Sequence, residues 1–220
     1  MLTIEPNSLK NRFRILRHGE SEANRQGIIV SSPEIGIERY GLTGIGVEQV
    51  TQTAINARLD SDTVIVSSDF RRAAETAHII HRVLSVQTPI QWSIDLRERY
   101  FGAWDGLDDS HYQTVWNSDE DPTKPMDNNV ESVTAVLQRF LRLIQHLEDR
   151  YEQKNILLVA HGDVLQIGSA WSHGIDPRLH RYLPAINTAE IRALSPSHSM
   201  SNPEICNPVS THLLHQTAQY

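Results

Sequence analysis

The sequence has a single cysteine among its 220 residues, Cys206, so no disulfide can form within the chain. It also lacks any run close to the roughly 20 consecutive apolar residues that a membrane-spanning helix needs. The first residues, MLTIEPNSLKNRFRIL, carry charge and proline where a signal peptide would have an apolar core. We therefore expect a cytoplasmic protein with no membrane partner.

Positive charge is scarce as well. The chain has 20 Lys and Arg against 27 Asp and Glu, which gives a formal net charge of −7. A nucleic-acid-binding surface needs an excess of cations, so we expect no nucleic acid partner. A few converging arginines can still bind a phosphate group inside an acidic protein. Hydrophobic residues make up 39% of the chain, which is enough for the core of a folded domain.

Strand-like and helix-like segments alternate along the chain. Short β-branched or apolar runs predict strands at 13–16, 64–66, 89–96, 156–160 and 189–194. Apolar residues at helical spacing predict helices that begin at Thr43, after a cap at 67–69, at 129–151 and at 164–171. This alternation predicts a three-layer α/β/α sandwich with a mainly parallel central sheet. We expect one domain over residues 1–194, with a cap-like insertion at about 100–128, followed by a polar tail at 195–220.

Chemistry-bearing side chains follow three of the predicted strands. They are Arg17 and His18 after the first strand, the arginines beyond Ser67–Asp69 after the second, and His161 after the fourth. Open α/β sheets bind ligands beyond the carboxyl ends of their strands, so these groups should converge on one crevice. Histidine can attack phosphorus, and the planar arginine fork binds phosphate oxygens.

Five segments, in order, carry a family resemblance. They read LRHGES at 16–21, YGLTGIG at 40–46, SDFRRAAETA at 68–77, LRERYFGAWDG at 96–106 and VAHG at 159–162. Together they resemble the histidine phosphatase superfamily, which includes the cofactor-dependent phosphoglycerate mutases. The resemblance covers roughly residues 12–194 and implies a phosphoglycerate mutase-like fold.

The resemblance also implies roles for individual residues. His18 would be the phosphorylated nucleophile, Glu98 the proton donor to the leaving oxygen, and His161 a further catalytic residue. Four residues would bind the substrate phosphate, namely Arg17, Asn24, Arg72 and Gly162. No metal and no cofactor are implied.

Elementary chemistry fits these roles. Adjacent positive charge would keep His18 neutral, as a nucleophile must be, while Arg17, Arg72 and a protonated His161 would neutralise the phosphoryl oxygens. Glu98 must hold a proton, and partial burial among nearby aromatic residues would raise its pKa. In an extended segment its neighbours Arg97 and Arg99 would point away from it.

Other residues receive more modest predictions. Arg71 is expected to face solvent in an ion pair, Glu20 to be structural, and Asn24 to cap a turn if it does not bind phosphate. His78 and His81 lie within one helical turn, but the sequence offers no third metal ligand near them. The sequence predicts no role for Asp105.

Three functions compete at this stage. They are hydrolysis of a small phosphorylated metabolite, a phosphoglycerate mutase-type phosphotransfer, and non-catalytic binding of a phospho-ligand. Mutases carry extra cations after the acid motif, whereas residues 107–121 are acidic here and would repel a substrate carboxylate. This favours a metal-independent phosphatase. The long 25–41 connection should shape specificity, while the identity of the ester and the oligomeric state have no signal in the sequence.

Overall fold

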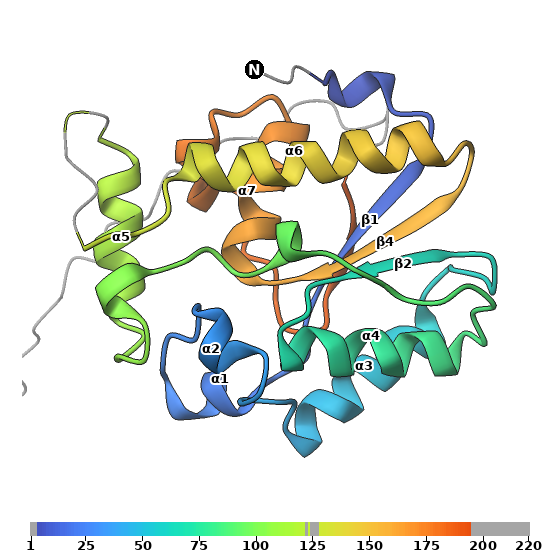
Figure 1. Cartoon of the computed structure of the whole chain (residues 1–220), viewed down its shortest axis with the longest axis horizontal. Coiled ribbons are helices and arrows are strands. Elements are labelled where there is room, and N and C mark those ends of the chain that lie inside the picture. The colour runs from blue at the N-terminus through green and yellow to red at the C-terminus, as the bar shows by residue number, and fades with distance from the viewer. Residues whose placement is uncertain (1–3, 122, 124–127, 195–220) are drawn as a thin grey trace, which may run out of the picture.

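The computed structural model describes residues 4–121, 123 and 128–194 (Figure 1). The predicted polar tail at 195–220 lies outside the described residues.

A five-stranded sheet forms the centre of the molecule, with the strand order β3-β2-β4-β1-β5. Strands β1 to β4 run parallel to their neighbours, and β5 pairs with β1 in the antiparallel sense. The strands are β1 (Arg12–Arg17), β2 (Val64–Ser67), β3 (Gln91–Trp92), β4 (Asn155–Ala160) and β5 (Ile191–Ala193). The register aligns Arg17 with Ala160, so the residues that follow them, His18 and His161, leave the sheet side by side.

Helices cover both faces of this sheet (Figure 1). They are α3 (Gly44–Asn56) and α4 (Arg71–Val83) on one face, and α6 (Val133–Arg150) and α7 (Gly162–Ser172) on the other. The alternation of side chains along β4 explains how one continuously apolar strand serves both layers. Ile156 and Leu158 pack with α6 and α7, whereas Leu157 and Val159 pack with α3 and α4. The predicted three-layer α/β fold with a mainly parallel sheet is confirmed.

Several shorter elements connect these layers. They are the helices α1 (Glu22–Gln26), α2 (Pro33–Gly36) and α5 (His111–Asp119), and the 3₁₀ helices η1 (Pro6–Ser8), η2 (Ile94–Leu96), η3 (Gly102–Trp104) and η4 (Pro177–Tyr182). No helix among the described residues is both long and apolar enough to span a bilayer.

Some predicted boundaries are corrected. The helix predicted at 129–151 begins only at Val133, because the Ser132 hydroxyl caps it by accepting from the Ala135 amide. The strand predicted at 89–96 contains only the two residues of β3 and then turns into η2. The helix cap predicted at 67–69 is wrong: Ser67 still belongs to β2, paired with Val159, and α4 begins at Arg71.

The segment around α5 forms a small separate layer over the carboxyl ends of the strands. Its own apolar cluster joins Ile29, Phe101, Val115 and Val130. The long 25–41 connection contributes to this cluster through Ile29 and contains α2.

Candidate active site

His18 lies just beyond β1 and is almost completely buried, with 2% of its surface exposed. Its Nδ1 lies 2.7 Å from the Gly19 carbonyl oxygen, which can only accept, so Nδ1 carries the ring proton. Arg72 Nε donates to Nε2 of the same ring at 3.0 Å. The two contacts select one tautomer, in which the Nε2 lone pair points toward Arg72.

Gly19 is required by close packing. A Cβ atom at this position would lie 2.6 Å from the Gly46 carbonyl oxygen and 2.8 Å from a Val50 methyl group. The reverse approach is closer still, because a Cβ at Gly46 would lie 2.0 Å from the Glu20 carbonyl oxygen. The two glycines thus let the His18 loop rest directly on the start of α3.

Two arginines surround His18. Arg72, on the first turn of α4, is buried and donates from Nη2 to the Val30 carbonyl oxygen at 2.9 Å. Arg17, at the end of β1, donates from Nη1 to the Ile186 carbonyl oxygen at 2.8 Å. Neighbouring Arg71 instead faces solvent and forms an ion pair with Glu75, as predicted.

His161 approaches His18 from β4, with the two ring centroids 5.2 Å apart. Its Nε2 lies 2.9 Å from the Ser68 hydroxyl oxygen. The same oxygen accepts from the Phe70 amide. In the arrangement in which the Ser68 hydroxyl donates its proton to Nε2, the ring proton of His161 lies on Nδ1.

Burial dominates the protonation of both histidines. It lowers the pKa of His18 well below the ordinary 6.5, and the charges of Arg72 and then Arg17 lower it further. Burial also lowers the pKa of His161 well below that value, again followed by the charge of Arg72. The prediction of a neutral His18 agrees with this direction, whereas the lowered pKa of His161 opposes the predicted protonation of that ring.

Three buried donors of this cluster have no hydrogen-bond partner among the described residues: Arg17 Nε, Arg72 Nη1 and His161 Nδ1. Only one other buried side-chain atom of the described chain shares this property, Nε2 of His180. An unpaired buried donor is costly, so a concentration of three calls for an acceptor with several oxygens.

Glu98 follows η2 and is buried. Burial raises the pKa of its carboxyl, the charge of Asp163 raises it further, and Arg72 opposes the effect. Its neighbours Arg97 and Arg99 form ion pairs with other acids. Arg97 is half-buried in a pair with Asp69, whereas Arg99 is fully buried and pairs with Asp119, because the chain passes beneath α5 at this point.

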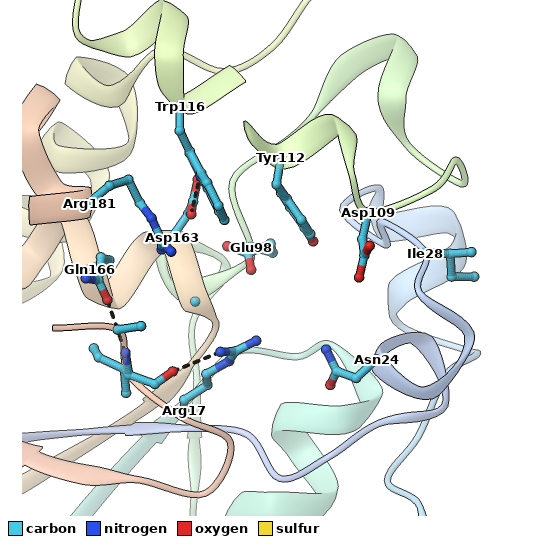
Figure 2. A pocket seen from close by; sticks show the side chains of 13 residues that line it. Arg17, Asn24, Ile28, Glu98, Asp109, Tyr112, Trp116, Asp163, Gln166 and Arg181 are labelled. Atoms are coloured by element: carbon cyan, nitrogen blue, oxygen red, sulfur yellow. Dashed lines mark hydrogen bonds between the residues drawn. The ribbon is translucent and has the colours of Figure 1, made fainter. Parts of the chain in front are cut away.

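A cavity of about 200 Å³ opens beside this cluster (Figure 2). Its lining residues are Arg17, Asn24, Ile28, Glu98, Asp109, Tyr112, Trp116, Gly162, Asp163, Gln166, Arg181, Ala185 and Ile186. Figure 2 shows Arg181 and Asp163 on one side of the cavity, and Asp109 and Ile28 on the opposite side.

Seven residues were predicted for the site, and the structure gathers them in two adjoining groups. Arg17, Asn24, Glu98 and Gly162 line the cavity. The others, His18, Arg72 and His161, do not line it within the described part of the chain. Arg17 links the groups, because its side chain lines the cavity while its charge lowers the pKa of His18.

Asn24 has the predicted capping role and also lies at the cavity. Its Oδ1 accepts from the Ser21 amide and hydroxyl at the start of α1, and its side chain also lines the cavity. Asp105 acquires a role: its Oδ1 accepts from the Ser31 and Ser32 amides and fastens the 25–41 connection to the acid motif.

Several cavity residues were missed. Asp163 directly follows the second histidine motif, at the start of a helix beyond a strand end, and that position was its signal. Trp116 and Tyr112 lie one turn apart on α5 with stacked rings. Arg181 comes from η4, a segment without a periodic pattern, and its guanidinium carbon lies 3.7 Å from the centroid of the Trp116 ring.

The acidic segment 107–121, expected to repel a substrate carboxylate, contributes little of its charge to the cavity. Asp119 turns inward to Arg99, and within the described chain Asp109 is the one acid of 107–121 that lines the cavity. Arg181 adds positive charge to the opposite wall. The cavity therefore presents both signs of charge to a substrate.

Metal-ligating side chains do not cluster in the described ranges, where no three His, Cys, Asp or Glu residues gather in a geometry for an ion. His78 contacts the Trp92 ring, and His81 bonds the Thr88 carbonyl oxygen.

Comparisons with known proteins agree with this geometry. The profile of the histidine phosphatase superfamily (branch 1) matches residues 13–204. An adenosylcobalamin/alpha-ribazole phosphatase of Escherichia coli (strain K12) is 29% identical over 163 residues, covering 71% of this chain and 76% of its own. A bifunctional protein of Mycobacterium tuberculosis is 30% identical over 194 residues, covering 83% of this chain, which spans 50% of that relative's length.

A solved structure extends the similarity to three dimensions. The structure of a putative alpha-ribazole-5'-P phosphatase from Escherichia coli superposes with a TM-score of 0.65 at 28% identity, covering 83% of this chain and 89% of the other.

Proposed function

The chain belongs to the histidine phosphatase superfamily, and we propose that it is a phosphatase that hydrolyses a small phosphate monoester through a phosphohistidine intermediate on His18. Similarity to phosphatases supports a hydrolase of phosphate esters. The observation that carries the proposal is the buried His18 ring, which its two hydrogen bonds hold in one tautomer beside three buried nitrogen atoms that have no partner among the described residues.

In the first step, the Nε2 lone pair of His18 attacks phosphorus and the bond to the leaving oxygen breaks. Arg17 Nε, Arg72 Nη1 and His161 Nδ1 donate to the non-bridging oxygens, where negative charge must be stabilised. Arg72 Nε also occupies the Nε2 lone pair of His18, so phosphate binding must draw Arg72 away from it.

Glu98 supplies the proton that the leaving oxygen needs to depart as an alcohol. Its raised pKa suits a group that must be protonated before the step and ionised after it. In the second step a water molecule attacks the phosphohistidine, Glu98 takes the proton of that water, and inorganic phosphate leaves. Both steps balance without a metal ion, because the arginines supply the positive charge.

The volume of the cavity, about 200 Å³, supports a small metabolite as the substrate. Aromatic rings of Tyr112 and Trp116 offer an apolar surface to its leaving group, while Arg181 and Asp109 offer opposite charges. A mutase-type phosphotransferase is the second candidate, favoured by Arg181 because a cation beside the phosphate site is what holds a substrate carboxylate.

The test is phosphate release from a panel of esters in the presence of EDTA. The panel includes phosphoserine, 3-phosphoglycerate, glycerol phosphate and a nucleoside monophosphate. We expect turnover that persists with EDTA, disappears in His18→Ala, and is retained in His78→Ala, a matched control at an exposed histidine. Phosphate transfer to a second hydroxyl without release would support the mutase instead, and binding without either reaction would support a phospho-ligand-binding protein.

A further inference from the structure

Asp163 is a buried carboxylate that the reaction described above does not use. It lies on the first turn of α7 and is 3% exposed. Its two oxygens accept from Trp116 Nε1 at 3.0 and 3.1 Å, and Oδ2 also accepts from Arg99 Nη1 at 3.3 Å. An indole N–H and a guanidinium, both of which can only donate, thus bind the carboxylate from two sides.

Asp163 and Glu98 line the same cavity, and Figure 2 shows Glu98 between Asp163 and Tyr112. The charged and titratable groups that act with Glu98 come from five other elements: Asp163 on α7, Arg72 on α4, Arg17 on β1, Tyr112 on α5 and Arg181 on η4. Burial also raises the pKa of the Tyr112 phenol, which is therefore neutral at ordinary pH. Asp163 is thus the group whose negative charge opposes the arginines at Glu98.

The arginines needed for phosphate binding create a conflict. A carboxylic acid near two guanidinium groups tends to lose its proton, because their positive charge stabilises the carboxylate. Glu98 must nevertheless hold a proton until the leaving oxygen takes it. A second carboxylate lining the same cavity resolves the conflict, since two like charges close together are unfavourable.

We propose that Asp163 is a positioning residue of the reaction: fixed in the ionised state by Trp116 and Arg99, it keeps the proton on Glu98 until the P–O bond breaks. The inference rests on the function proposed above. When the leaving oxygen takes the proton, Glu98 becomes a carboxylate and the phosphoryl group is on His18. Repulsion from Asp163 then favours the return of a proton to Glu98, which is the proton of the attacking water.

The experiment measures kcat/KM against pH for Asp163→Asn and wild type on an alkyl ester from the panel and on p-nitrophenyl phosphate. Dividing kcat/KM of the variant by kcat/KM of the wild type at each pH cancels the effect of the titration of the substrate itself. For the alkyl ester we expect the alkaline limb to move down by about one pH unit, so that the ratio falls about tenfold across that range. For p-nitrophenyl phosphate the ratio should stay flat, because its leaving group departs without a proton.

Two controls separate charge from structure. Asp109→Asn removes another carboxylate of the same cavity. The alkaline limb of its kcat/KM profile should lie at the same pH as that of the wild type. Asp163→Glu keeps the charge and should restore the limb. If the ratio of kcat/KM between Asp163→Asn and wild type does not change with pH for either ester, the inference is overturned, whether that ratio is below one or equal to one. The proposed function stays intact in that case.

Two further outcomes remain distinguishable. Wild-type protein that turns over no ester overturns the proposed function itself. If Asp163→Asn does not fold, Trp116→Phe takes its place, because it removes one donor to Asp163 and keeps an aromatic ring. A smaller shift of the same sign is then expected, and an unmoved limb contradicts the inference.

Discussion

The buried ion pair between Arg99 and Asp119 gives the sharpest stability prediction. Arg99 is 0% and Asp119 1% exposed in their side chains, and the guanidinium binds the carboxylate in two places, at 2.6 and 2.7 Å. Asp119→Ala removes both bonds and leaves a charge that cannot reach water. Breaking a buried pair from one side costs about 3–5 kcal/mol. Arg99 keeps its bonds to the Glu131 carbonyl oxygen and Asp163, so we expect a loss near the lower limit, about 3 kcal/mol.

That loss is measured by thermal or urea unfolding. A change of 3 kcal/mol lowers the melting temperature of a domain of this size by about 6–12 °C. Asp108→Ala is the matched control on the same segment, since Asp108 is exposed, and its melting temperature should equal that of the wild type. The double variant Arg99→Met with Asp119→Leu should recover most of the stability, because it removes both charges together. If Asp119→Ala unfolds within 1 °C of the wild type, the reasoning about this pair is refuted.

Three further predictions concern the site and its support. Glu98→Gln should lower kcat/KM for an alkyl ester by about 10²–10⁴-fold and for p-nitrophenyl phosphate much less, because only the alkyl leaving group needs a proton. An equal loss of kcat/KM on both esters in steady-state assays would contradict the role of Glu98. Gly46→Ala should destabilise the fold by about 2 kcal/mol, because its Cβ would lie 2.0 Å from the Glu20 carbonyl oxygen. Gly44→Ala is the control and should not destabilise the fold, because a Cβ at that position meets no atom within 4 Å. Equal unfolding midpoints of the two variants in urea would argue against the close packing. The lowered pKa of His18 means that, as pH falls below about 6.5, the unfolded chain binds a proton that the folded chain does not, so the free energy of unfolding decreases with falling pH. His18→Gln should reduce that dependence by up to about 1.4 kcal/mol per pH unit, and identical pH dependence in both proteins would show that His18 is not buried in its neutral form.

The layers of the fold could be predicted because the local sequence determines them. Strand β4 is apolar at every position from Ile156 to Ala160, as expected of a strand covered on both faces, and α4 keeps its apolar stripe at helical spacing. Ligands of open α/β sheets bind beyond the carboxyl ends of the strands, and from this the sequence predicts that His18 and His161 lie at the same edge of the sheet. The register of β1 against β4 explains why, because it aligns the last residues of the two strands.

The rest of the site depends on contacts between distant segments. Arg181 reaches the cavity from a 3₁₀ helix with no periodic pattern, and only the packing of η4 on α7 brings it there. Arg99 looks like a surface cation in the sequence, but it is fully buried because two acids from α5 and α7 surround it. The lowered pKa of His161 could not be predicted from the sequence for a similar reason, since the burial that lowers it is a property of the assembled core.

The central claim is that His18 carries the phosphoryl group on Nε2. The most direct test is to mix the protein with an ester that it hydrolyses, quench the reaction in alkali, and locate the acid-labile phosphoryl group by mass spectrometry and ³¹P NMR. The account predicts phosphohistidine at position 18, attached at Nε2, in wild type and in Glu98→Gln, and none in His18→Ala. A phosphoryl group on another residue, or turnover by His18→Ala at the wild-type rate, would contradict it.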